Sequence, residues 1–145
     1  MNTGSTEYPS HPRVAVGAVV FKEGRVLLVQ RGKPPACGQW AIPGGSVLLG
    51  ETLQQAAERE IMEETGIVIR AGAPVFTFDT IERDDTGAIR FHYVIVDLRA
   101  DFVSGDLRSG DDAVAVRWVA AEELNAPGVN PRTLELLRSH FKFGN

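Results

Sequence analysis

Three glutamates, Glu60, Glu63 and Glu64, stand within five consecutive residues of a segment with helical periodicity. At about 100° per residue, Glu64 lies one turn above Glu60 and Glu63 lies beside them, so the three carboxylates share one helix face. Like charges at this spacing repel by about 0.2–0.5 kcal/mol per pair in an isolated helix, and Arg59 is the one fixed cation within the same two turns. A hard divalent cation with several oxygen ligands would remove this repulsion, so the pattern predicts a site for Mg²⁺ or Mn²⁺.

The helix that carries these glutamates is expected to end at Thr65, with Gly66 in the left-handed position that follows. At its start, either Glu51 or Thr52 could accept hydrogen bonds from the free N–H groups of the first turn. The opposite face carries a narrow apolar stripe, which indicates close packing on a flat surface such as a sheet: Leu53, Ala56, Ala57 and Ile61. A merely solvated acidic face, the alternative explanation of the glutamates, leaves this stripe unexplained.

The glycines and acids around this helix resemble a family signature. Gly45, five residues, Glu51, seven residues and then Arg59-Glu60-Ile61-Met62-Glu63-Glu64-Thr65-Gly66-Ile67 match the signature of the Nudix hydrolases without a departure. A chance match has a probability on the order of 10⁻⁹ per start position. The resemblance implies an α/β fold, an α/β/α sandwich around a mixed β-sheet. It also implies metal-dependent hydrolysis of a nucleoside diphosphate linked to another moiety, by attack of water on phosphorus.

The resemblance further implies which residues hold the metal. Glu60 and Glu64 would be the principal ligands, and Glu63 would be a third, through a second metal ion or a bound water. The backbone carbonyl of Gly44 would complete the oxygen shell. The expected cofactor is therefore Mg²⁺, with Mn²⁺ as the alternative.

Supporting and proton-transfer roles are expected around these ligands. Arg59 would orient the carboxylates through charge-assisted hydrogen bonds, and Glu51 would support a ligand or act as an outer ligand. Asp112 stands six residues before Trp118, where several Nudix enzymes carry an acid that reaches the metal cluster, and Asp111 is the alternative. The general base remains open between a glutamate of the signature and Asp112.

Four residues are candidates for substrate contact: Arg31, Gly45, Glu51 and Phe78. Arg31 opens a loop that contains two prolines, where its charge could contact phosphate or could keep the loop soluble. Gly45 lets the backbone approach a ligand closely. Phe78 is one of several strand aromatics that could stack on a base, with core packing as the alternative for each ring.

The favoured substrate class is ADP-ribose or another nucleoside diphosphate sugar, because Phe91-His92-Tyr93-Val94 resembles Nudix members that act on ADP-ribose-like compounds. The chain departs from many ADP-ribose pyrophosphatases in lacking a proline within residues 80–84. Hydrolysis of a nucleoside triphosphate, including an oxidised one, is the alternative reaction. A non-catalytic nucleotide-sensing module is a further alternative, and the complete set of signature acids argues against it.

The composition indicates one soluble domain, since 145 residues with 43% hydrophobic content suffice for a single core. We expect residues 13–145 to form it, after a disordered tail at 1–12. The net charge of −4 argues against a nucleic-acid or membrane partner and leaves a small-molecule nucleotide. The single cysteine, Cys37, and the lack of a signal or membrane-spanning segment favour a cytoplasmic setting. Dimers are common among Nudix proteins, so a homodimer is an expected alternative to a monomer.

The elements that must position these residues follow from apolar runs and turn residues. A buried hairpin, a helix, a second hairpin, a further strand and a closing amphipathic helix are expected in this order. Their predicted strands are 14–21, 25–30, 67–70, 75–78, 91–98 and 114–119, and the closing helix is 133–141, with Pro131 at its start. Residues 101–112 are expected to form a loop.

Overall fold

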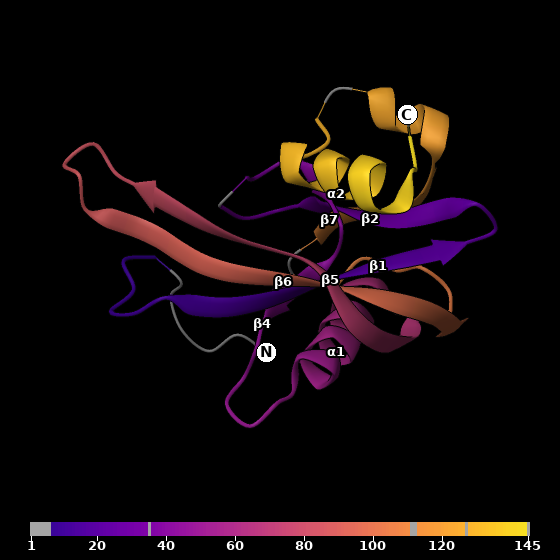
Figure 1. Ribbon diagram of the computed structural model, residues 1–145, viewed down its shortest axis with the longest axis horizontal. Coiled ribbons are helices and arrows are strands. Elements are labelled where there is room, and N and C mark those ends of the chain that lie inside the picture. The colour runs from indigo at the N-terminus through magenta and orange to yellow at the C-terminus, as the bar shows by residue number, and fades with distance from the viewer. Residues whose placement is uncertain (1–6, 35, 111–112, 127, 145) are drawn as a thin grey trace.

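The computed structural model describes residues 7–34, 36–110, 113–126 and 128–144. A mixed sheet of seven strands lies between two helices (Figure 1). Helix α1, Leu53–Thr65, covers one face, and helix α2, Pro131–Phe141, covers the other. The predicted α/β/α sandwich around a mixed β-sheet is therefore confirmed.

Strand β1, Arg13–Lys22, organises the sheet. It pairs in parallel with β6, Ile89–Ser104, which in turn pairs antiparallel with β5, Val68–Arg83. On its other edge β1 pairs with β2, Arg25–Arg31, at one end and with the short β4, Gly44–Ser46, at the other. Residues 16 and 18–20 of β1 are almost fully buried, as expected for a central strand covered by helices on both faces.

Three shorter elements complete the fold. β3, Trp40–Ala41, and β7, Ala113–Ala120, both pair antiparallel with β2. The 3₁₀ turn η1, Ala121–Asn125, leads towards α2, whose first turn is capped by Asn130 and begins with a proline. In the described part of the chain, no helix has the length and apolar character needed to cross a membrane.

The second hairpin is longer than the sequence predicts. Continuous strands of 16 residues, β5 and β6, replace the short segments expected at 67–70, 75–78 and 91–98, and β6 continues into the predicted loop as far as Ser104. Register shifts on both sides of Pro74 accommodate this proline and Gly72, which in the sequence resemble strand breakers. At the hairpin turn, the Asp84 carboxylate accepts hydrogen bonds from the N–H groups of Thr86 and Ala88.

Both ends of α1 are fixed by local hydrogen bonds. Thr52 is the N-cap: its hydroxyl accepts from Gln55 N–H at 3.0 Å, while the Gln55 side chain accepts from Thr52 N–H at 2.9 Å. Gly66 has φ +78° and its N–H donates to the Met62 carbonyl, as predicted for this position. The predicted apolar stripe packs on the sheet, with the side chains of Ala56, Ala57 and Ile61 fully buried.

The first described residues belong to the stretch that was predicted to be a disordered tail. Tyr8 N–H donates to the carbonyl of Arg90, and its hydroxyl donates to Asp84 at 2.8 Å. The Arg90 guanidinium pairs with Glu7 at 2.7 Å. These contacts place residues 7 and 8 against the turn end of the β5–β6 hairpin.

Candidate active site

Arg59 is the centre of a hydrogen-bond network on α1. Its Nε and Nη2 donate to the two carboxylate oxygens of Glu51 at 2.6 and 2.9 Å, and Nη2 also donates to the Ser46 carbonyl at 3.0 Å. Its Nη1 donates to Glu60 at 3.1 Å and to Glu63 at 3.2 Å. The hydrogen bond from Arg59 lowers the pKa of Glu51, and the same bond raises the pKa of Arg59. Arg59 thus neutralises part of the acidic cluster and fixes the orientation of its carboxylates.

Glu51 belongs to this hydrogen-bond network. Besides the two bonds from Arg59, its carboxylate accepts the N–H of Leu48 at 2.8 Å. Among the described residues, it is absent from the lining of the cavity described below. These contacts are those of a supporting residue, and the roles of Glu51 as an outer ligand and in substrate contact stay predictions.

Glu60 lies against the backbone of Gly45. A Cβ on Gly45 would overlap the Glu60 carboxylate, so only glycine allows this approach. Gly44 is equally constrained, because a Cβ there would collide with the Val16 carbonyl of the neighbouring strand β1. The two glycines therefore let β4 fit between β1 and the acidic face of α1.

Glu64 is buried one turn beyond Glu60 and accepts a hydrogen bond from Gly44 N–H at 3.0 Å. Glu60, Glu64, Gly44 and Gly45 all line one cavity of about 560 Å³. Glu63 lies apart from them: its side chain is 43% exposed, it pairs with Arg59, and it is absent from the described lining. The structure thus brings two of the three predicted carboxylate ligands to the cavity wall.

The donor chemistry of this wall fits a hard divalent cation. Carboxylate oxygens and a glycine backbone are available, and the described lining residues include no cysteine or histidine. Within the described residues, no group of three or more acidic, His or Cys side chains is arranged around one point. Arg59 donates hydrogen bonds to Glu60 and Glu63, and Glu64 accepts one from Gly44 N–H. Glu60 and Glu64 would hold the ion, whereas Glu63 lies outside the described cavity lining.

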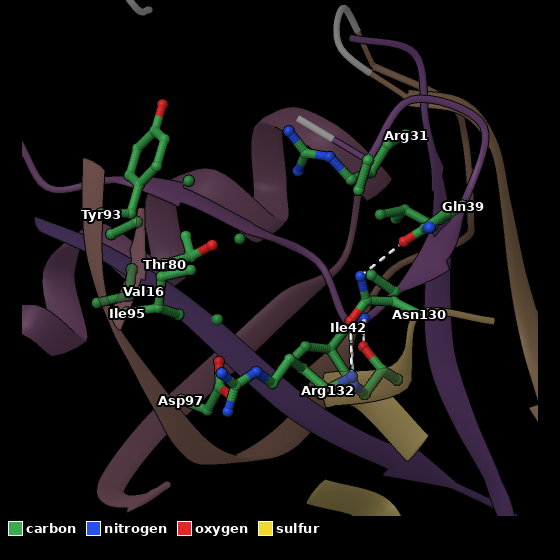
Figure 2. Close-up of a pocket in the computed structure, with 18 of the residues that line it drawn as sticks. Val16, Arg31, Gln39, Ile42, Thr80, Tyr93, Ile95, Asp97, Asn130 and Arg132 are labelled. Atoms are coloured by element: carbon green, nitrogen blue, oxygen red, sulfur yellow. Dashed lines mark hydrogen bonds between the residues drawn. The ribbon is translucent and has the colours of Figure 1, made fainter. Parts of the chain in front are cut away.

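The other end of the cavity is built by alternate residues of the long hairpin, as the two-residue period of a strand requires. Phe78, a candidate for substrate contact, lies here, and the Arg132 guanidinium stands 4.7 Å from the centre of its ring. The cavity-lining residues of β5 are Phe78, Thr80 and Glu82, and those of β6 are Tyr93, Ile95 and Asp97. Figure 2 shows Thr80, Tyr93, Ile95 and Asp97 around this part of the cavity. Phe91, by contrast, is buried at 1% exposure.

Positive charge reaches the cavity from two elements. The predicted Arg31 ends β2 and lines the cavity together with Lys33, and Arg132 comes from the first turn of α2 (Figure 2). Beside Arg132, the Asn130 side chain is used as a helix cap, since it accepts the N–H groups of Arg132 and Thr133 and donates to Gln39. The cavity lining therefore offers cations that could bind phosphate.

Asp97 and Arg132 are site residues that sequence reasoning missed. Asp97 is 4% exposed, and burial raises its pKa from 3.8 to about 7. An acidic residue inside the apolar run 91–98 was the available signal for it. Arg132 had no such signal, because only the packing of α2 brings it near Phe78.

The two candidates for an additional acid, Asp111 and Asp112, lie outside the described residues. The loop just before them is attached to the end of α1. Gly110 N–H donates to the Glu64 carbonyl at 2.8 Å, and Arg108 N–H donates to the Thr65 carbonyl at 2.9 Å. The assignment of Asp112 remains a prediction.

Known proteins are similar to this chain in sequence and in fold. The NUDIX domain model matches residues 11–139. The ADP-ribose pyrophosphatase of Methanocaldococcus jannaschii is 37% identical over 103 residues, 71% of this chain, and this chain spans 59% of that protein. Putative 8-oxo-dGTP diphosphatase 2 of Mycobacterium tuberculosis is 31% identical over 121 residues, covering 78% and 77% of the two chains.

A solved structure agrees with these relatives. The crystal structure of a MutT NUDIX hydrolase from Burkholderia pseudomallei has a TM-score of 0.75 and 33% identity, covering 89% of this chain and 98% of that chain. The chain therefore belongs to the Nudix hydrolase family, as the signature at 45–67 predicts.

Proposed function

We propose that this chain is a metal-dependent pyrophosphohydrolase that cleaves a nucleoside diphosphate linked to another moiety, with ADP-ribose or a nucleotide sugar as the favoured substrate class. The observation that carries this proposal is the cavity that joins Glu60 and Glu64 at one end to Phe78 and Arg132 at the other. The similarity to an ADP-ribose pyrophosphatase supports the substrate class. The setting that we favour is cytoplasmic.

In the proposed reaction, each residue has a role that follows from its position in the cavity. Glu60 and Glu64 would hold Mg²⁺ or Mn²⁺, which supplies positive charge to a phosphoanhydride and lowers the pKa of bound water. Arg59 keeps the carboxylates in place through the five hydrogen bonds described above. Arg31 would contact phosphate oxygens, and Phe78 would lie beside the base. A glutamate of the signature or Asp112 would accept the proton of the attacking water.

A second candidate reaction is hydrolysis of a nucleoside triphosphate, including an oxidised one, to a monophosphate and pyrophosphate. The observation that favours it is the similarity to a putative 8-oxo-dGTP diphosphatase over 78% of this chain. A nucleotide-sensing module without catalysis is a weaker candidate, because the chain retains every acid of the signature.

Product analysis separates these candidates. The full chain is incubated with Mg²⁺ and, separately, with ADP-ribose, a nucleotide sugar, ATP, dGTP and 8-oxo-dGTP, and the products are resolved by chromatography. Formation of AMP and ribose phosphate is the result we expect. A monophosphate with pyrophosphate from the triphosphates alone would replace the favoured substrate class with the second. Binding without any hydrolysis would contradict both enzymatic proposals.

A further inference from the structure

Strand β5 forms one edge of the sheet, and helix α1 covers the first part of this edge. In the described part of the chain β5 pairs with β6 alone, so some of its backbone N–H and C=O groups point away from the sheet. Ala71 N–H donates to the Glu58 carboxylate of α1 at 2.9 Å. The Gly72 carbonyl accepts from the side chain of Gln54, also on α1, at 3.1 Å. Side chains of α1 thus satisfy free backbone groups at this end of β5.

The later part of the same edge is open. From Phe76 to Glu82, β5 pairs with β6 residue by residue, without a bulge or a proline. Among the residues that the structure describes, the backbone groups of residues 76–83 have no hydrogen-bond partner outside β6. Figure 1 shows that the turn end of this hairpin extends away from both helices. A regular edge of this kind can accept a further strand.

Side chains along this open edge alternate between the two faces of the sheet. One set lines the cavity: Phe78, Thr80 and Glu82. The set on the opposite face is exposed: Asp79, Ile81 and Arg83. Ile81, with 51% exposure, is the apolar member of the exposed set. The register shift at Arg83 does not change this order, because the additional residue of that bulge, Arg90, lies on β6.

Asp79 and Arg83 supply the charges of the exposed face. Asp79 forms no hydrogen bond or ion pair with another described residue. Arg83 donates one N–H to the Gly87 carbonyl at 2.9 Å and keeps further donors for another partner. Charged side chains on an edge strand oppose pairing unless the pairing brings opposite charges together. The two charges stand at equal spacing on either side of Ile81, so pairing about Ile81 brings them together.

Pairing of two copies about a two-fold axis places each residue opposite a fixed partner. With the axis at Ile81, Asp79 lies opposite Arg83 of the partner subunit, and symmetry repeats this pair. An axis at Asp79 or at Glu82 places two acids opposite each other. An axis at Thr80 leaves Asp79 opposite an isoleucine, and axes midway between residues next to Ile81 bring Asp79 opposite another acid. The charges therefore select one register.

We propose that the open edge of β5 binds a second copy of this chain, with residues 79–83 of the two copies paired antiparallel about Ile81. The two sheets become continuous, and both cavities open on the same face. Thr80 lies opposite Glu82 of the partner subunit, so the partner adds a carboxylate at the border of the cavity. This association requires no assumption about the reaction.

The first test is sedimentation velocity of the full chain from about 5 to about 500 μM, a range suited to a short interface. The wild type should form a dimer whose share rises with concentration. Asp79→Arg should raise the dissociation constant of the dimer at least about tenfold, because both symmetric pairs become repulsive. Arg83→Asp should have the same effect.

A double variant and a control make this test specific. Asp79→Arg combined with Arg83→Asp restores opposite charges in the same register, so its dissociation constant should return to within about threefold of the wild type. Asp101→Arg makes the same change of charge on β6, away from the open edge, and should dimerise like the wild type. Recovery in the double variant cannot arise from a loss of folding in the single variants.

The register is tested by disulfide formation in a Cys37→Ser background, which removes the single native cysteine. Ile81→Cys places two thiols at the axis, where opposed Cα atoms stand about 4.5–5.5 Å apart. Thr77→Cys, on the same face, places its thiols roughly 27 Å apart, because each lies four residues from the axis. An added mild oxidant should link Ile81→Cys into a covalent dimer on non-reducing gels and leave Thr77→Cys unlinked.

Several outcomes would overturn this inference. They are a wild-type chain that stays monomeric up to about 500 μM, and a dimer that neither charge reversal weakens. Weakening by the single variants without recovery in the double variant would overturn it too, as would linkage at Thr77→Cys in place of Ile81→Cys. None of these results depends on hydrolysis, so the proposed function stands or fails separately, on its product analysis.

Discussion

At the scale of single residues, Glu64 is a buried carboxylate that links α1 to β4 at the cavity wall. It accepts from Gly44 N–H and is buried beside the cavity that Glu60 also lines. Glu64→Gln keeps an oxygen for Gly44 and removes the negative charge. We expect Mg²⁺-dependent turnover to fall at least about a hundredfold with unchanged circular dichroism.

Glu58→Gln is the matched control for this substitution. Glu58 lies on the same helix and accepts the Ala71 N–H at 2.9 Å, and it is absent from the described cavity lining. Its turnover should stay within about twofold of the wild type. Near wild-type activity of Glu64→Gln, measured in the same steady-state assay, would remove Glu64 from the proposed mechanism.

The buried Asp97 should make stability fall as pH rises. The folded-state pKa is about 7 and the ordinary value is 3.8, so the folded protein binds this proton more tightly than the unfolded chain. The contribution is fully present below pH 3.8 and is lost as pH rises to 7, at up to about 1.4 kcal/mol per pH unit. The charged residues that line the same cavity, Arg31, Lys33, Glu60, Glu64, Glu82 and Arg132, are common to wild type and variant.

Urea unfolding measures this effect. Between pH 5 and pH 7, the free energy of unfolding of the wild type should decrease by roughly 2–3 kcal/mol relative to that of Asp97→Asn. Asp101→Asn should follow the wild-type curve, because Asp101 is exposed. Parallel curves for the wild type and Asp97→Asn would show that Asp97 titrates normally.

At the scale of elements, the approach of β4 to α1 depends on Gly45. In Gly45→Ala the new Cβ would overlap the Glu60 carboxylate, so either the glutamate or the strand must move. We expect kcat/KM to fall by about tenfold to a hundredfold, since displacement of a catalytic group by about 1 Å has effects of this size. Far-UV circular dichroism should show that α1 is retained.

Gly72→Ala provides the comparison. Gly72 lies in β5, where an added Cβ would meet the Arg99 carbonyl at 3.3 Å, and it is absent from the described cavity lining. This variant should lose a little stability and keep its activity. Equal kcat/KM values for Gly45→Ala and the wild type would mean that Glu60 needs no close approach to β4.

Local patterns explain what could be predicted at this scale. The end of α1 at Gly66 and its apolar stripe depend on residues within a few turns of each other, so the sequence alone indicated them. The second half of the cavity depends on long-range register. Asp97 meets Gly17 only because β1 and β6 pair in parallel, and Arg132 meets Phe78 only because α2 packs over the sheet. The spacing of these residues along the sequence does not predict either contact.

At the scale of the whole molecule, metal binding should stabilise the fold. An ion that binds the folded chain alone raises the free energy of unfolding by about 2.7 kcal/mol at one hundred times its dissociation constant. We expect the melting temperature to rise with Mg²⁺ concentration, and the double variant Glu60→Gln and Glu64→Gln to lose this dependence. The comparison uses calorimetry at constant ionic strength, with the Glu58→Gln variant as a control. Equal stabilisation of the double variant by Mg²⁺ would show that the ion binds elsewhere than at Glu60 and Glu64.

The position of Gly17 between two strands fixes one dimension of the cavity. Gly17 pairs with Gly44 of β4 on one side and with Asp97 of β6 on the other. Because adjacent strands are about 4.8 Å apart, these two backbone positions stand roughly 10 Å from each other, and the sheet itself maintains that distance. The sheet backbone therefore sets the distance between Gly44 and Asp97, so substitutions of side chains that line the cavity would change its chemistry without changing this distance.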